Sequence, residues 1–316
     1  MLQVHSRNLQ LSAIGASTNI RFSFQWLPPT VERNVHERRS MSVIDLARYP
    51  IDRPGPARDA LIAECRRQLA ETGCVVLEGF VTPEALASMN AEGRELAPQA
   101  HFNTTQTNCY SSADDPSLPE GHPKRVFMER TNGFVAGDLI EPDSAVRGLY
   151  ESEALRMFVA ACMEVDEIHE YGDPLGHLVF NVLRPGTQHP WHFDNNDFIV
   201  TLLTQKADAG GKFEYCPRIR SEQDESIGSV AATLAGDDTL VHRLDPDPGS
   251  LQIFYGRHSL HRVTRIEGDR ERHTLILGYS DTPGEIADAE RTKRLFGRAT
   301  PEHERAAREG RERVSV

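Results

Sequence analysis

The side chains best suited to chemistry lie in one short stretch, which reads His189-Pro190-Trp191-His192-Phe193-Asp194-Asn195-Asn196-Asp197-Phe198. Within it, His192 and Asp194 are two residues apart. Residues i and i+2 of a β-strand point to the same face, so both side chains can reach one metal ion. Imidazole and carboxylate are both ligands of transition metals. The stretch therefore predicts a metal site that needs a further ligand from elsewhere in the chain.

Two histidines downstream are candidates for the third ligand, in the run Arg257-His258-Ser259-Leu260-His261-Arg262-Val263. His261 is the better placed, because it lies within the apolar alternation of a predicted strand, whereas His258 precedes that strand. Two histidines and one carboxylate on a rigid β scaffold form the facial triad of non-haem Fe(II) sites. Such a triad leaves positions open for a bidentate cosubstrate and O2, which a closed tetrahedral zinc site would not.

A 2-oxo acid that chelates iron has a second carboxylate, for which a fixed arginine is the natural partner. Arg270 and Arg272 lie at the start of the next predicted strand. If that strand begins at Glu271, Arg272 shares a face with Thr274, and both then point inwards. Arg270 is closer to the turn and is expected to be solvated. Thr201 and Thr274 are further candidate donors to the oxo acid, unless they are ordinary strand threonines.

Seven short strands are predicted to position these residues, and clusters of Gly, Pro and Asp separate them. Their expected ranges are 177–183, 198–205, 211–216, 239–244, 250–255, 260–266 and 273–279. This spacing is typical of a sandwich or barrel of the jelly-roll type. Helices are predicted at 59–72, at 83–96 with Thr82 as cap, and at 153–164 with Ser152 as cap. The expected fold class is α+β, with a mainly β core and N-terminal helices packed on it.

The chain of 316 residues divides into three segments by composition. Residues 1–40 carry five arginines against two acids. Because they lack clear periodicity, we expect a disordered extension or a spurious upstream start, with a targeting peptide as the alternative. Residues 41–297 are predicted to form one domain with its β core at about 174–282. Residues 298–316 are predicted to be a charged tail that frays. Residues 98–140 are polar and turn-rich, with a long loop expected at 103–115.

Composition excludes several classes of function. A formal net charge of −12 argues against a nucleic-acid-binding surface, which would cluster Lys and Arg. No apolar run approaches the roughly 18 residues that a membrane helix needs. Five scattered cysteines without a Cys-X-X-Cys motif predict neither a disulfide framework nor a thiolate zinc site, and fit a reducing cytoplasm. The expected partner is a small molecule, and a homo-oligomer remains open.

The order His192-X-Asp194, then His261, then Arg272 on the following strand resembles the non-haem Fe(II)/2-oxoglutarate-dependent dioxygenases. The phrases Asn181-Val182-Leu183-Arg184-Pro185-Gly186, Trp191 to Phe198 and Ser259 to Val263 are similar to the branch containing hydroxylases and radical halogenases of free amino acids such as lysine. The resemblance covers roughly Cys74 to Gly284 and implies a double-stranded β-helix, a relative of the jelly roll. It implies Fe(II), 2-oxoglutarate and O2 as requirements, with succinate and CO2 as coproducts.

Asp194 bears on the reaction type within that branch. The halogenases have a small residue at the matching position, and chloride takes the vacant place on the metal. Because a carboxylate is present here, the resemblance implies hydroxylation of an amino acid or amino-acid-like metabolite. One alternative is an enzyme that uses the same iron to desaturate or cyclise its substrate. A second alternative is a non-catalytic, cupin-like metal-binding protein, which would have no need of a buried Arg272.

Five residues are candidates for substrate binding. His189 matches a position that faces the substrate in lysine-acting relatives, and the alternative is that it is a loop histidine without such a role. Asn195 follows the metal ligands and could orient the substrate. Arg130, in a charged patch, is either solvated or a partner for a substrate carboxylate. Asp173 could neutralise a cationic substrate amine, as could Glu170, although surface acids are common in a chain with 47 of them.

Overall fold

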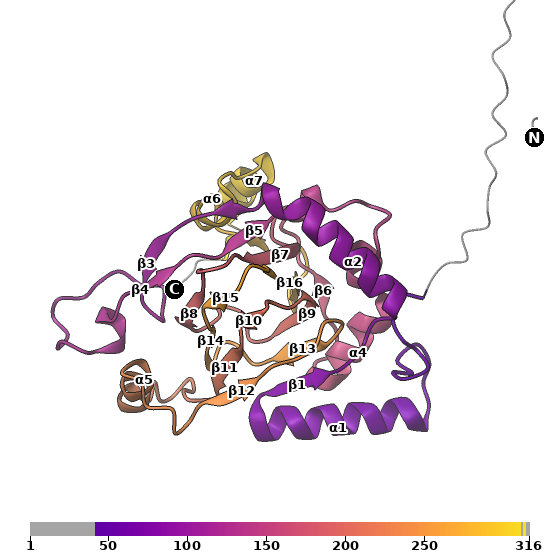
Figure 1. Cartoon of the computed structure of the whole chain (residues 1–316), viewed down its shortest axis with the longest axis horizontal. Helices are drawn as coiled ribbons and strands as arrows, with labels where there is room; N and C mark the ends of the chain where they lie inside the picture. Colours follow the sequence, from indigo (N-terminus) through magenta and orange to yellow (C-terminus); the bar gives the residue numbers. More distant parts are fainter. Residues whose placement is uncertain (1–41, 311, 314–316) are drawn as a thin grey trace, which may run out of the picture. The chain divides into compact units, whose positions relative to one another are not determined.

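Two antiparallel β-sheets form the centre of the fold (Figure 1). The computed structural model describes residues 42–310, 312 and 313, so the predicted extension at 1–40 lies outside the described residues. The large sheet has the strand order β1 (Cys74–Leu77), β13 (Leu251–Phe254), β9 (Ile199–Gln205), β16 (Arg272–Leu277), β7 (Leu178–Leu183), β5 (Gly133–Val135) and β2 (His101–Phe102). The small sheet has the order β12 (His242–Leu244), β11 (Phe213–Cys216), β14 (Leu260–Val263) and β8 (His189–His192).

The two sheets pack face to face through aromatic side chains. The ring of Phe254 on the large sheet lies edge-on to Phe213 and Tyr215 of the small sheet, at centroid distances of 5.1 and 5.4 Å. Leu183 and Val263 extend this contact. Such pairs bury much apolar area in a fixed geometry. The predicted double-stranded β-helix is confirmed, and the inner faces of its sheets are available to form a site.

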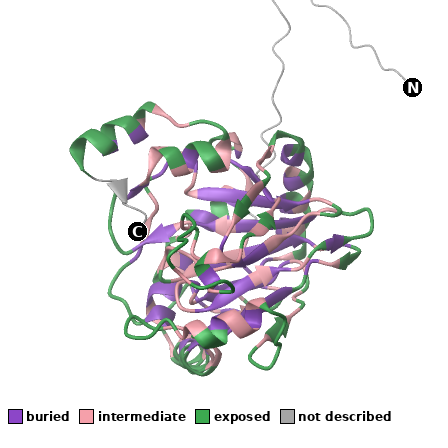
Figure 2. Cartoon of the chain, turned by 90° about the vertical axis from the view of Figure 1, so that its left-hand side faces the viewer, coloured by how far each residue is buried: buried purple, intermediate pink, exposed green. Residues whose placement is uncertain are grey.

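Helices cover the opposite face of the large sheet and bury its apolar side chains. They are α1 (Pro56–Thr72), α2 (Pro83–Leu96), α3 (Ala145–Tyr150) and α4 (Glu153–Met163). Figure 2 shows the strands mostly buried and the outer helix surfaces exposed. The predicted caps are present, because the hydroxyls of Thr82 and Ser152 accept hydrogen bonds from the amides of Ala85 and Leu155. None of the described helices is long and apolar enough to cross a membrane.

The remaining elements are short. The 3-10 helices are η1 (Ala97–Gln99), η2 (Pro123–Arg125) and η3 (Gly137–Leu139). The paired short strands are β3 (Thr105–Thr107) with β4 (Met128–Arg130), β6 (His169–Glu170) with β17 (Tyr279–Ser280), β10 (Ala209–Gly210) with β15 (Ile266–Glu267), and β18 (Ile286–Ala287) with β19 (Glu312–Arg313). Beside the small sheet lies α5 (Ile227–Leu234), and α6 (Ala289–Phe296) and α7 (Pro301–Glu309) lie between β18 and β19 in the sequence.

All seven predicted strands are present, but the segment 98–140 was only partly anticipated. It supplies β2 and β5 to the large sheet, and the expected loop at 103–115 contains β3. These strands have two or three residues each. Such a length is too short for an alternation of apolar and polar residues to become visible. They matter for the site because β4 lies beside β8.

The expectation of a frayed tail after residue 298 is wrong for its first part. Helix α7 buries Ala306 and His303 completely. The Nε2 atom of His303 lies 3.0 Å from Oδ2 of Asp173, which also accepts from the amide of Ala287. Oδ1 of Asp173 accepts from the amides of Leu175 and Gly176. Both oxygens are therefore occupied, and Asp173 has a structural role in place of the predicted substrate contact.

We predict that His303→Ala lowers the free energy of unfolding by about 2–4 kcal/mol, because it leaves a buried carboxylate oxygen short of a partner. Urea denaturation followed by circular dichroism measures the change. Arg308→Ala, at an exposed position of the same helix, is the control and should cost less than about 1 kcal/mol. Equal effects of the two substitutions would show that α7 is not anchored through His303.

Candidate metal centre

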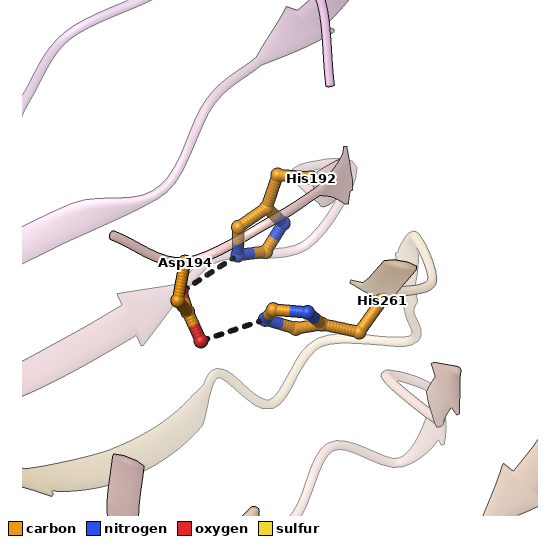
Figure 3. Close-up of side chains that lie close together, drawn as sticks. All are labelled: His192, Asp194 and His261. Atoms are coloured by element: carbon orange, nitrogen blue, oxygen red, sulfur yellow. Dashed lines mark ion pairs between the residues drawn. The ribbon is translucent and has the colours of Figure 1, made fainter. Parts of the chain in front are cut away.

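The structure brings His192, Asp194 and His261 together, with one potential ligand atom from each within 4.8 Å of the others (Figure 3). His192 ends β8 and His261 lies on β14, where the two residues are direct partners in the antiparallel register. Direct partners point to the same face of a sheet. Nε2 of His192 lies 3.6 Å from Oδ1 of Asp194, and Nε2 of His261 lies 3.3 Å from Oδ2.

Both imidazoles have the tautomer that a metal ligand needs. Nδ1 of His192 lies 2.8 Å from the carbonyl of Pro190, and Nδ1 of His261 lies 2.9 Å from the carbonyl of Ser259. A carbonyl only accepts, so each Nδ1 carries the proton and each Nε2 presents a lone pair. Burial, followed by the charge of His261, lowers the pKa of His192 to about 3, so His192 is neutral near pH 7.

The carboxylate of Asp194 faces these lone pairs. Its Oδ2 is buried and has no hydrogen-bond donor among the described residues. Burial raises the pKa of Asp194, but His261, His192 and Arg291 outweigh burial and hold the pKa at about 2. A carboxylate oxygen and an imidazole lone pair face each other at 3.3 Å, an arrangement that a cation between them would relieve. Two nitrogens and one carboxylate fit a divalent transition metal.

Neighbouring candidates lie outside this cluster. His258 is not part of the group of ligand atoms found among the described residues. The carboxylate of Asp197 instead pairs with the guanidinium of Arg257 at 2.5 Å, and a second nitrogen of Arg257 donates to the carbonyl of Asn195. Arg257 thus holds the loop that follows the metal ligands.

Polar side chains lie on the inner face of the large sheet. Arg272 is 6% exposed and donates a hydrogen bond to the hydroxyl of Thr274, two residues along β16. Burial lowers the pKa of Arg272 to about 10, and no carboxylate of the described chain forms an ion pair with it. Thr201 is opposite Ile276 in the register and so shares this face. Arg270, by contrast, is exposed and pairs with Asp208.

A second arginine, Arg130, lies on β4, beside the strand β8 that carries His192. Nε of Arg130 donates to Oδ1 of Asn132 at 2.9 Å, and the amide of Asn132 donates to Oδ1 of Asn181 at 3.2 Å. Burial first, and then the charge of Arg291, lowers the pKa of Arg130 to about 10. Its charge in turn lowers the pKa of His189 and of His192. The positive charge of Arg130 therefore helps to keep both imidazoles neutral.

The other predicted substrate contacts differ in position. The ring of His189 stacks on that of His192 at 3.8 Å between centroids, so His189 lies beside the centre. Burial lowers its pKa well below the usual value. Asn195 is half-buried in the loop after the ligands. Glu170 pairs with Arg156 at 2.7 Å, so Glu170, like Asp173, is already bound to a side chain of the protein.

Three residues of the centre were not anticipated from the sequence. Asn181 interrupts the apolar run of β7, and this interruption was the available signal for an inward polar contact. Asn132 gave no such signal, because it sits in a turn-rich segment. Gly256 makes room for the ligand carboxylate, since a Cβ atom there would lie 1.9 Å from Oδ2 of Asp194. The carbonyl of Gly256 also accepts the amide of Asp194 at 3.1 Å.

We predict that Gly256→Ala weakens Fe(II) binding by at least about tenfold, because the new methyl group must displace the carboxylate of Asp194. Anaerobic titration with Fe(II) measures the affinity. Gly228→Ala in α5, where a Cβ would contact nothing within 4 Å, is the control. Unchanged iron affinity in Gly256→Ala would contradict the role of Asp194 as a ligand.

Several solved structures are similar to this fold. A prolyl-4-hydroxylase of Pseudomonas putida is 16% identical, with 68% of this chain and 96% of that chain covered and a TM-score of 0.43. AviO1 of Streptomyces viridochromogenes is 15% identical, covering 70% and 95%, with a TM-score of 0.49. The non-haem α-ketoglutarate-dependent epimerase SnoN of nogalamycin biosynthesis is 13% identical, covering 71% and 84%, with a TM-score of 0.47. No curated protein matches the sequence.

A family model described as halogenase D matches residues 57–294. This range contains β1 to β18, and with them His192, Asp194, His261 and Arg272. The match covers well over half of the sequence. The chain belongs to the halogenase D family.

Proposed function

We propose that the protein is an Fe(II)- and 2-oxoglutarate-dependent oxygenase that hydroxylates an unactivated C–H bond of a small amino acid or a related metabolite. Succinate and CO2 are the coproducts. The observation that carries the proposal is the convergence of two Nε2 lone pairs and a carboxylate that lacks a hydrogen-bond donor at Oδ2. These are the donors of a facial triad, which leaves room for a cosubstrate and O2.

His192, Asp194 and His261 would hold the iron, which together with 2-oxoglutarate and O2 supplies the oxidant for C–H cleavage. The protein orients its ligands before the metal arrives. The carbonyls of Pro190 and Ser259 fix both imidazole rings through Nδ1, so that only Nε2 is free to bind. Because the ligands are already oriented, metal binding requires little rearrangement of the site.

Arg272 would hold the distal carboxylate of 2-oxoglutarate. A buried guanidinium without an anion is unfavourable, since burial penalises the charged form. A bound carboxylate removes that penalty and forms charge-assisted hydrogen bonds with the planar fork. Thr274 already accepts a hydrogen bond from Arg272 and fixes its direction, and the inward Thr201 is a further donor to the cosubstrate.

Arg130, His189 and Asn195 would form the substrate side. Arg130 is held by Asn132 and has no ion-pair partner within the described part of the chain, so its charge is available for a substrate carboxylate. The ring of His189, stacked on a metal ligand, lies where a substrate near the iron would contact it. Asn195 adds an amide at the adjoining loop.

Asp194 supports hydroxylation over halogenation, although the family is described as halogenase D. The halogenases that the sequence resembles have a small residue at this position, which leaves a place for chloride. Here the carboxylate points at the two imidazoles, and Gly256 provides the space for it. With that position filled by the protein, the transferred group is a hydroxyl.

Turnover with a panel of free amino acids tests the proposal. Full-length protein with Fe(II), 2-oxoglutarate and O2 should form succinate together with a product one oxygen atom heavier than its substrate, as measured by mass spectrometry. Chlorinated product in the presence of chloride would contradict hydroxylation. Absence of substrate-dependent succinate across the panel would contradict an amino-acid substrate.

We predict that Asp194→Gly lowers hydroxylation by at least about a hundredfold, because one of three iron ligands is removed. Product formation and bound iron should both be measured. Asp197→Asn is the matched control, since Asp197 pairs with Arg257 and not with the metal ligands. Retention of near-wild-type turnover in Asp194→Gly would rule out the facial triad.

Arg272→Ala is expected to raise the KM for 2-oxoglutarate by about 10–100-fold, the loss of charge-assisted hydrogen bonds to one carboxylate. Initial rates of succinate formation at varied 2-oxoglutarate measure it. Arg270→Ala, an exposed neighbour paired with Asp208, should leave this KM within about twofold of wild type. If the Arg270 variant alone is impaired, the anchor has been assigned to the wrong arginine.

A further inference from the structure

Helix α6 carries Arg291, a third arginine that forms no ion pair with a carboxylate of the described residues. Arg291 is half-buried, as are Leu295 and Phe296 on the following turn, so it lies on the sheet-facing side of the helix. The ring of Phe296 contacts that of Phe134 at 6.2 Å, and the amide of Asn103 donates to the carbonyl of Arg294. These contacts hold α6 against β2 and β5.

Arg291 and Arg130 contribute positive charge to the same region of the protein. The guanidinium of Arg130 lies over the ring of Phe134, the ring that Phe296 of α6 also contacts. The charge of Arg291 lowers the pKa of both Arg130 and Asp194, and Arg294, one turn further along α6, contributes to the effect on Arg130. Arg130 on β4 and Arg291 on the packed helix α6 thus add positive charge on the same side of the fold, and Arg294 adds to it from an exposed position.

No carboxylate of the described residues forms an ion pair with Arg130, Arg291 or Arg294, although the chain has 47 acids for 35 basic residues. Other arginines have partners: Arg243 and Arg262 share Glu214. Like charges held close together without a counter-ion repel each other. A cluster of this kind attracts anions and raises their local concentration.

We propose that the substrate carries two anionic groups, with Arg130 binding its α-carboxylate and Arg291 binding an acidic group on its side chain. The substrate class is thus a dicarboxylic amino acid, such as aspartate or glutamate, or a derivative with the same two charges. This assignment rests on the proposed function, because it takes the metal centre as the place of reaction. Arg294, exposed on the same helix, adds positive charge that attracts the anion.

A cationic, lysine-like substrate fits these surroundings poorly. The two acids that the sequence offered for binding an amine are both engaged, Glu170 with Arg156 and Asp173 with His303. A second positive charge beside Arg291 and Arg130 would add repulsion. The arginines of the site therefore favour a substrate with an anionic side chain over one with a cationic side chain.

Calorimetric titration of the full-length, Fe(II)-loaded protein under anaerobic conditions tests the assignment. 2-Oxoglutarate is kept saturating, so that the added amino acid does not occupy the cosubstrate position. L-Aspartate and L-glutamate are compared with L-asparagine and L-glutamine. We expect at least one acid to bind at least about tenfold tighter than its amide.

Arg291→Gln should abolish that preference while leaving the affinity for 2-oxoglutarate unchanged. Lys293→Gln is the control, because Lys293 is exposed on the same helix and pairs with Glu290 at 2.8 Å. Equal affinity for acid and amide, no binding of either acid, or a preference that survives in Arg291→Gln would overturn the assignment. Failure to bind 2-oxoglutarate would instead contradict the proposed function, and a preference for the acids would still support an anionic ligand.

Discussion

The register between β8 and β14 is the constraint on which the metal centre depends. It sets His192 directly opposite His261, so both imidazoles leave the same face of the small sheet. A shift of one residue would send one of them to the other face. Beyond the strand, the amides of Phe193 and Asp194 donate to the carbonyls of Cys109 and Gly256, which fixes the turn that presents the carboxylate. Packing of Phe254 on His261, at 4.9 Å between ring centroids, ties this register to the large sheet.

Charge is distributed unevenly around that centre. The protein as a whole is acidic, and many surface arginines pair with acids. At the centre, the buried Arg272 donates to a hydroxyl group, the half-buried Arg130 donates to an amide oxygen, and Arg291 on α6 adds a further positive charge. Unpaired buried cations reduce stability, and functional sites are where such groups are concentrated. Anionic ligands would supply the missing counter-charges, the cosubstrate at the inner sheet face and the substrate at the α6 side.

The sequence predicted those features that depend on local pattern. The period-2 alternation identified seven strands, and the spacing of His192 and Asp194 on one strand edge identified two members of the cluster. Choosing His261 over His258 followed from the same alternation. Contacts between distant segments left no local signal: His303 and Asp173 are separated by 130 residues. Gly256 looks like any turn glycine until its distance to Asp194 is known, and Arg291 has the same local pattern as the solvated Lys293 beside it.

The most direct test of the central claim is the visible spectrum of the anaerobic protein as 2-oxoglutarate is added to its Fe(II) form. A facial triad with open positions lets the oxo acid chelate the iron, and the proposed function predicts a charge-transfer band that saturates at one oxo acid per iron. Fully iron-loaded protein that develops no band at saturating 2-oxoglutarate would contradict it.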